Sequence, residues 1–93
     1  MAESDATEQV WFVERTYSDD EQNLIIITYA TLDGSHYFRK ERALTSFTDS
    51  RETTAAVETS TDNLGPVEDP ERRNQYADAA SRTKSNYDPD EIV

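Results

Sequence analysis

Residues 24–43 read LIIITYATLDGSHYFRKERA, and this stretch decides the fold. The segment 24–31 is rich in β-branched and aromatic residues, which are enriched in strands. Asp33-Gly34 is the strongest short-range signal for a two-residue hairpin turn of type I′. We therefore expect the segments 24–31 and 35–43 to pair as an antiparallel hairpin.

This turn also predicts the register of the hairpin. It places Tyr29 opposite Phe38, and Ile27 opposite Lys40. The segment 24–31 is apolar on both of its faces, a pattern typical of a strand that is covered on both sides.

A third strand is expected just before the hairpin. Residues 10–17, VWFVERTY, have strand composition, and the polar segment 18–23, SDDEQN, reads as a turn. In a regular strand, Tyr17 would share a face with Trp11. The first half of the chain therefore predicts a three-stranded meander.

A helix is expected over residues 50–63. Asp49 and Glu52 have the spacing of a capping box, the apolar residues that follow recur near a helical period, and Gly65-Pro66 is a helix stop. Threonine, a poor helix former, opposes this prediction at positions 53, 54, 59 and 61.

A second helix is expected to start at Asp69-Pro70, with Asp69 as the N-cap and Pro70 in the first turn, and to stop before Asp88-Pro89. One stripe of this helix would carry Tyr76, Ala79, Ala80, Thr83 and Tyr87.

These elements predict an α+β fold, in which a three-stranded antiparallel meander is followed by two helices (βββαα). Residues 10–87 would form one domain, between an acidic disordered leader at 1–9 and a flexible acidic tail at 88–93. Two helices can cover one sheet face, and we expect the other face to be buried in a homodimer. A monomer with one helix on each face is the alternative. The expected interface residues are Phe12, Ile25, Ile27, Tyr29 and Phe38.

Composition limits the classes of function. The chain has 93 residues, no cysteine and a net charge of −11. A disulfide scaffold and a thiolate zinc site are excluded. No apolar run has the length of a membrane span, and the N-terminus is unlike a signal peptide, so we expect a cytoplasmic protein. The charge disfavours attraction of the whole molecule to DNA or to anionic membranes.

The acidity resembles that of proteins from extreme halophiles. Aspartate and glutamate total 20 against 9 basic residues, most of which are arginine. At about 1 M salt the Debye length is only ~3 Å, so the self-repulsion of such a chain would be screened. The alternative is an acidic mesophilic protein with flexible ends.

Three features of the sequence are candidate sites of chemistry. His36 follows the turn without a recognisable nucleophile, and a solvated turn residue explains it better than a general base. Glu14 and Glu41 would point to opposite sheet faces, which disfavours an acid/base pair. The acidic turns at 19–21 and 88–91 lack the spacing of a calcium loop. We therefore predict no catalytic residue, no metal site and no cofactor.

A basic and aromatic stretch offers an alternative function. Tyr37 and Phe38 could stack on bases while cationic neighbours contact phosphate, as in sheet-based nucleic-acid binders. The second expected helix adds another basic cluster, at Arg72, Arg73, Arg82 and Lys84. The alternative nucleic-acid site therefore comprises Tyr37, Phe38, Arg39, Lys40 and Arg42.

The favoured prediction is a non-enzymatic interaction module that self-associates or binds a protein partner through its sheet. Large apolar and aromatic side chains are the usual anchors of interface energy, and the candidate face is rich in them.

Overall fold

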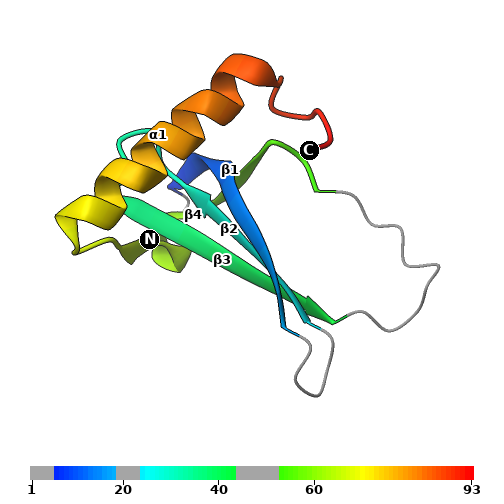
Figure 1. Ribbon diagram of the computed structural model, residues 1–93, viewed down its shortest axis with the longest axis horizontal. Helices are drawn as coiled ribbons and strands as arrows, with labels where there is room; N and C mark the ends of the chain where they lie inside the picture. Colours follow the sequence, from blue (N-terminus) through cyan, green and yellow to red (C-terminus); the bar gives the residue numbers. More distant parts are fainter. Residues whose placement is uncertain (1–5, 19–23, 44–52) are drawn as a thin grey trace.

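A computed structural model of the chain describes residues 6–18, 24–43 and 53–93. In this part of the chain, five strands form one antiparallel sheet in the order β4-β1-β2-β3-β5, and one α-helix packs on it. Figure 1 shows α1 lying across one face of the sheet. The elements are β1 (Thr7–Ser18), β2 (Leu24–Ala30), β3 (His36–Ala43), β4 (Ala56–Ser60), the 3₁₀ helix η2 (Thr61–Asn63), β5 (Gly65–Pro66) and α1 (Pro70–Asn86).

The prediction of two helices after the meander is wrong. The described part of the segment expected to be helical holds β4 and η2, and β4 pairs with Thr7–Trp11 of β1. The threonines and Val57 favour extended chain, and β1 supplies a hydrogen-bonding partner that no local pattern reveals. The expected cap at Asp49 and Glu52 lies outside the described residues.

The predicted three-stranded sheet is wrong, because β4 and β5 extend it to five strands in the described residues, but the register of the β2–β3 hairpin is as predicted. Tyr29 pairs with Phe38, and Ile27 pairs with Lys40. The turn itself differs from a two-residue loop, because the N–H of Gly34 donates to the carbonyl of Thr31 and the loop spans residues 32–35. A four-residue loop and a two-residue loop that are both centred between Asp33 and Gly34 give the same strand pairing. The predicted register is therefore right, although the predicted turn is not.

A β-bulge in β1 changes which residues share a face. The pairing with β2 shifts between Phe12 and Glu14, so that Phe12 pairs with Tyr29 and Glu14 with Thr28. The bulge inserts one residue and reverses the alternation beyond it. The register position of Tyr17 therefore lies on the face of Phe12, and the expectation that it shares a face with Trp11 is wrong.

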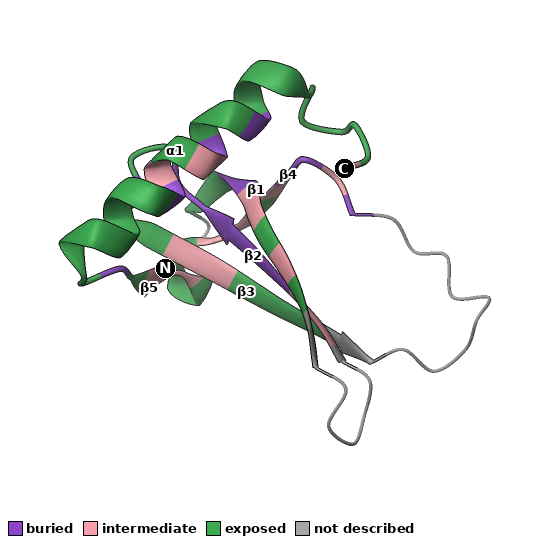
Figure 2. Cartoon of the chain, viewed as in Figure 1, coloured by how far each residue is buried: buried purple, intermediate pink, exposed green. Residues whose placement is uncertain are grey.

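Helix α1 begins as expected, but only part of its predicted stripe packs on the sheet, because Tyr87 follows the helix and is 38% exposed. Asp69 Oδ1 accepts a hydrogen bond from the N–H of Glu71 at 3.1 Å, with Pro70 at the start of the helix. Of the predicted stripe, Tyr76, Ala80 and Thr83 are buried. Thr83 Oγ1 also donates to the carbonyl of Phe12 at 2.8 Å, which joins the helix to the bulge. Figure 2 shows buried positions along β2 and on the sheet-facing side of α1.

The segments expected to be loose at both ends of the domain make ordered backbone contacts. β1 begins at Thr7, inside the segment expected to be a disordered leader. The C-terminal residues, expected to be loose, pair with the chain before β4: Ala55 N–H donates to Glu91 at 2.7 Å, and Val93 N–H donates to Thr53 at 2.9 Å. The tail is docked because its backbone completes hydrogen bonds at this edge.

Candidate interaction surface and neighbouring clefts

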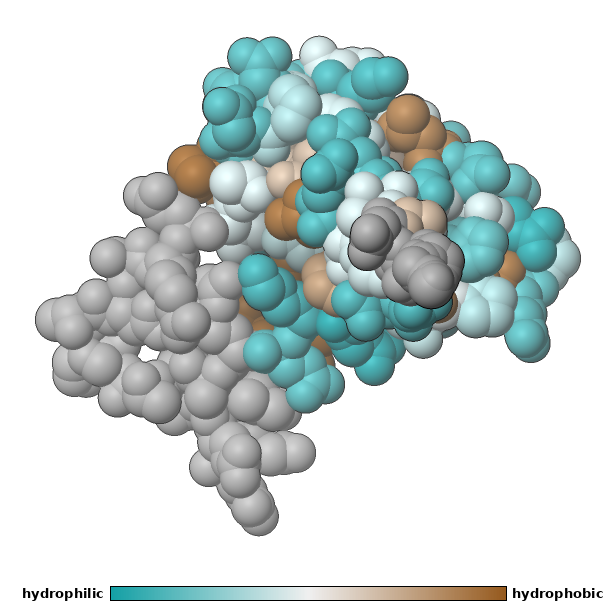
Figure 3. Space-filling model, turned by 180° about the vertical axis from the view of Figure 1, so that it is seen from behind, coloured by the Kyte–Doolittle hydropathy of each residue, from teal (hydrophilic) through white to brown (hydrophobic). Residues whose placement is uncertain are grey.

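The two faces of the sheet have different coverings. Beneath α1, Trp11 and Ala30 pack with Ala80 and Tyr76 of the helix. The opposite face, which we call the back face, holds a cluster of its own around Val10, Ile27 and Tyr29. Among the described residues, no side chain of α1 belongs to that cluster. Figure 3 shows the molecule from behind, where hydrophobic side chains appear between hydrophilic ones.

All five residues predicted to form the interface lie on the back face. Ile27 and Tyr29 are each only 1% exposed, so they form the base of the cluster. Phe12, Ile25 and Phe38 are half-buried above them. The rings of Phe12 and Tyr29 are 6.4 Å apart edge to face, and those of Tyr29 and Phe38 are 6.0 Å apart. This packing fixes the rotamers of the outer aromatic residues.

Two cations flank this apolar cluster. Arg15 and Lys40 pair with Ile27 from either side, so their register places them on the back face. The Arg15 guanidinium lies 5.4 Å from the Phe12 ring centroid and donates to the Val93 carbonyl at 3.2 Å. Lys40 is exposed. The part of the back face around Ile27 is therefore basic on a chain whose net charge is −11, while Glu8 shares the face of Val10 farther along β1.

The residues of the alternative nucleic-acid site are divided between the two faces. Tyr37 and Arg39 lie on the α1 side, where the Arg39 guanidinium is 5.9 Å from the Tyr37 ring centroid. Phe38 and Lys40 occupy the back face, as does the register position of Arg42, whose side chain lies outside the described set. The alternation of a strand places neighbouring residues on opposite faces, so this run does not form one continuous basic surface.

The basic cluster expected on the helix is also dispersed. Arg73 donates twice to the Val67 carbonyl, at 3.3 and 3.0 Å, which fastens α1 to the chain before it. Arg72 lines a small cleft with Tyr37 and Arg39. Arg82 lines a different cleft nearer the C-terminal end of α1.

The carboxylates at Glu14 and Glu41 share a face after all. The bulge places Glu14 opposite Thr28 of β2, and Glu41 pairs with Ile26 of the same strand. Thr28 and Ile26 are two residues apart, so they and their partners lie on the same face of the sheet. The expectation that they point to opposite faces is therefore wrong. Strand β2 lies between them and their partners are two residues apart along it, so their backbones are about 12 Å apart.

The β2–β3 turn is a hydrogen-bonded polar network. Asp33 Oδ1 accepts from the hydroxyls of Thr31 and Ser35, both at 2.7 Å, and from the Ser35 N–H at 3.0 Å. These donors lower the pKa of Asp33 from 3.8 to about 2, the Ser35 N–H contributing most. The network stabilises the ionised carboxylate.

This network does not activate a nucleophile. Ser35 Oγ lies 3.0 Å from His36 Nδ1 and 2.7 Å from Asp33. An ionised carboxylate only accepts hydrogen bonds, so the Ser35 proton points to Asp33 and the hydroxyl accepts from the histidine. The cleft beside it, about 620 Å³, is lined by Trp11, Leu32 and these turn residues. A nucleophilic triad would need the opposite order of proton donation.

The acidic turns contain no metal site where they are described. The turn at 19–21 lies outside the described residues, and in the other turn Glu91 Oε1 accepts the N–H of Asp88 at 2.8 Å. In the described ranges, no three acidic or histidine side chains are grouped so as to hold a metal ion.

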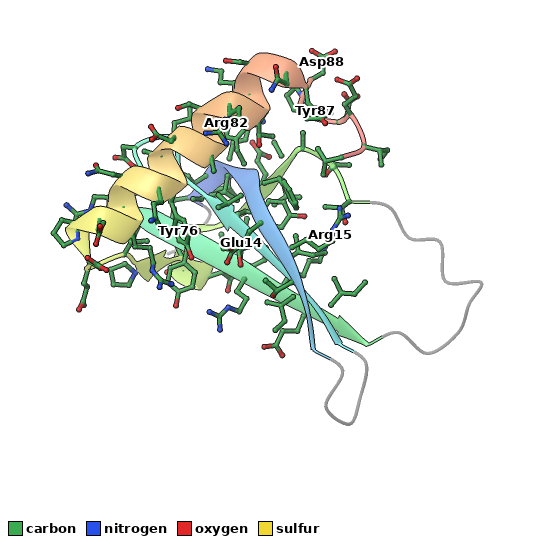
Figure 4. All side chains as sticks on the ribbon, in the orientation of Figure 1. Glu14, Arg15, Tyr76, Arg82, Tyr87 and Asp88 are labelled. Atoms are coloured by element: carbon green, nitrogen blue, oxygen red, sulfur yellow. The ribbon has the colours of Figure 1, made fainter. Side chains whose placement is uncertain are left out.

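A cleft that sequence analysis missed lies between β1 and the C-terminal half of α1. Arg15 and Arg82 line it together with Tyr87 and Val93. These residues are far apart in sequence, and only the packing of α1 and the docked tail brings them together. Figure 4 shows Arg82 on α1, Tyr87 directly after the helix and Arg15 on β1.

Comparison with known proteins gives a family but no activity. Residues 4–93 match the model of a protein family described as "Family of unknown function (DUF7967)". Neither the curated proteins nor the solved structures contain a match to this chain. The described residues include no helix with the length and apolarity that a bilayer crossing requires.

Proposed function

Because the chain belongs to DUF7967, a family of unknown function, we propose its role from its own residues. It is a non-enzymatic protein-interaction module, and its back face binds an acidic segment of a partner protein that carries apolar anchors. The observation that carries this proposal is the half-buried apolar group Phe12, Ile25 and Phe38 on the face that α1 leaves open.

The composition of the back face is unusual for a solvated sheet face. An antiparallel sheet with one covered face normally presents alternating polar side chains on the other. Here the face that the described residues of α1 do not cover has an aromatic and aliphatic cluster, although the mean hydropathy of the whole chain is −0.90. Exposed apolar patches mark sites of protein interaction, and the half-buried Phe12, Ile25 and Phe38 are the part of this cluster that a partner can reach.

Charge favours an acidic partner over a second copy of the chain. Arg15 and Lys40 flank Ile27, so a two-fold contact centred there would bring the cations of one copy near those of the other, and like charges in an interface are unfavourable. An acidic segment would instead complement both cations. This argument weighs against the homodimer expected from sequence and favours the protein partner.

The first test uses Phe38→Ala with Leu32→Ala as its control. Leu32 is 37% exposed in the β2–β3 turn and does not belong to the back-face cluster. Each tagged protein is incubated with lysate of its own source in roughly 2 M KCl, a concentration that screens long-range charge. The partner retained by the wild type is then purified and titrated calorimetrically against each variant.

We expect Phe38→Ala to weaken partner binding by about tenfold or more, as for an aromatic anchor, and Leu32→Ala to leave binding unchanged. Circular dichroism should show that both variants remain folded. Unfolding of Phe38→Ala would place this residue in the core and overturn the assignment. Loss of the captured material on nuclease treatment would favour nucleic acid instead.

A second test addresses charge with the only two lysines of the chain. Lys40→Glu reverses a charge on the back face, and Lys84→Glu makes the same change on α1. We expect only Lys40→Glu to weaken binding of the purified partner. A stable dimer detected by light scattering, disrupted by Phe38→Ala and with no other protein bound, would identify the second copy as the occupant.

A further inference from the structure

We propose that the cleft between β1 and the C-terminal half of α1 binds a small carboxylate with an aliphatic chain. The cleft lies where β1 runs beyond its pairing with β4, so Phe12 and Arg15 of the back face also line it, but its ligand is argued from its own lining. The cleft encloses about 360 Å³, which is at the lower end of the volumes of small-molecule sites. Its apolar lining includes Val13, Ala79 and Val93, and its rim carries Arg15, Arg82 and Tyr87.

Arg15 is already held in a fixed position beside this cleft. Its guanidinium donates to the Val93 carbonyl at 3.2 Å and lies over the Phe12 ring at 5.4 Å. A guanidinium has five N–H donors, so these contacts leave others available to a ligand. A donor that is ordered before binding loses less conformational entropy when the ligand arrives.

Arg82 supplies a second cation without a competing partner. It is exposed, and the structure gives it no hydrogen bond or ion pair within the described ranges. Glu91 on the neighbouring tail uses Oε1 to accept the Asp88 N–H. The C-terminal end of α1 carries partial negative charge, which Arg82 and Lys84 offset.

The arginines on the rim of the cleft and its apolar lining together indicate which class of ligand it binds. Arginine binds carboxylates in a planar, bidentate manner, and charge-assisted hydrogen bonds of this kind are the stronger ones. The Thr83 hydroxyl already donates its hydrogen bond to the carbonyl of Phe12, so it has no proton left to donate to an anion. Val13, Ala79 and Val93 leave an apolar region for a short alkyl chain. An anion without an alkyl chain would contact only the arginines of the cleft, and an alkyl chain without a charge would contact only its apolar lining.

The test is a titration of ¹⁵N-labelled protein with hexanoate in roughly 2 M KCl, where long-range charge is screened. Acetate lacks the alkyl chain and hexan-1-ol lacks the charge, so both are run as matched ligands. We expect hexanoate to shift the amide resonances of Val13, Ala79 and Val93 with a dissociation constant in the millimolar range, about what a ligand of this size can reach. Equal shifts with acetate or with hexan-1-ol would overturn the proposal.

Arg82→Gln and Arg72→Gln provide the matched variants. Both arginines are exposed on α1, but Arg72 lines a different cleft. We expect Arg82→Gln to weaken hexanoate binding about tenfold, the usual scale for one charge-assisted hydrogen bond, with Arg72→Gln unchanged. Equal affinities of the two variants, in spectra that show folded chains, would refute the cleft as the site.

Discussion

Gly34 is the residue on which the contact between turn and helix depends. Its φ of +73° lies in the left-handed region, and it is buried against α1. A Cβ at this position would collide with the carbonyl of Arg73 and approach the Ala77 nitrogen to 2.9 Å. Both backbone conformation and space therefore require glycine here.

We expect Gly34→Ala to destabilise the fold by about 1–3 kcal/mol from backbone strain, with the collision adding to this value. Urea unfolding followed by the fluorescence of the buried Trp11 measures the change. Asn74→Ala is the control, because Asn74 is exposed on α1 and alanine favours helix. A wild-type midpoint for Gly34→Ala would contradict the packing described for the turn.

Asp33 gives a prediction about acid stability. Its folded pKa is about 2, below the ordinary 3.8, because the Ser35 N–H and the Thr31 and Ser35 hydroxyls bind the carboxylate. A depressed pKa contributes stability above pH 4 that is lost as the pH falls through about 2. The urea midpoint should therefore fall less steeply over this range in Asp33→Asn than in the wild type.

Asp62→Asn serves as the comparison for this measurement, since Asp62 is exposed and its carboxylate accepts none of the hydrogen bonds found among the described residues. If Asp33→Asn and Asp62→Asn reduce the pH dependence of the urea midpoint by the same amount, the network around Asp33 does not contribute to stability.

At the scale of elements, β4 shows how tertiary pairing overrides a helical pattern. Spacing and Gly65-Pro66 indicated a helix, but the backbone of residues 56–60 bonds to β1 instead. Isolated helices of this length are marginal in water, so a strand partner decides the outcome. The bulge at Phe12 and Glu14 is a second element that no local pattern revealed.

The docked tail gives a prediction at this scale. In a chain that ends at Asp88, the N–H groups of Ala55 and Ala56 lose their acceptors, Glu91 and Pro89. We expect hydrogen exchange at these two amides to accelerate by about tenfold or more, since a net hydrogen bond contributes roughly 1 kcal/mol. Amides of β2, such as that of Ile27, are the internal control. Unchanged exchange at Ala55 and Ala56 would show that the tail is not docked in solution.

At the scale of the whole molecule, we expect the net charge to affect the stability of the fold. A net charge of −11 on 93 residues disfavours the compact state through self-repulsion in dilute buffer. We expect the melting temperature to rise with KCl up to about 1 M, where the Debye length falls to ~3 Å.

A charge-reduced variant separates screening from other effects of salt. Asp62→Asn, Asp78→Asn and Asp90→Asn at exposed positions lower the net charge from −11 to −8. Its melting temperature should rise less steeply with KCl than that of the wild type. Identical slopes would show that salt acts through something other than charge repulsion.

What the sequence determined by itself is local. Strand composition over 24–43 and the position of Asp33-Gly34 predicted the hairpin and its register, and Asp69-Pro70 predicted the start of α1, because turn and cap chemistry act within a few residues. The same alternation brought the five predicted interface residues to one face. Only the tertiary structure decided that 56–60 is a strand, that a bulge reverses the faces beyond Phe12, and that Arg15 and Arg82 line one cleft. These features arise from hydrogen bonds and packing between segments far apart in the chain, which no local pattern encodes.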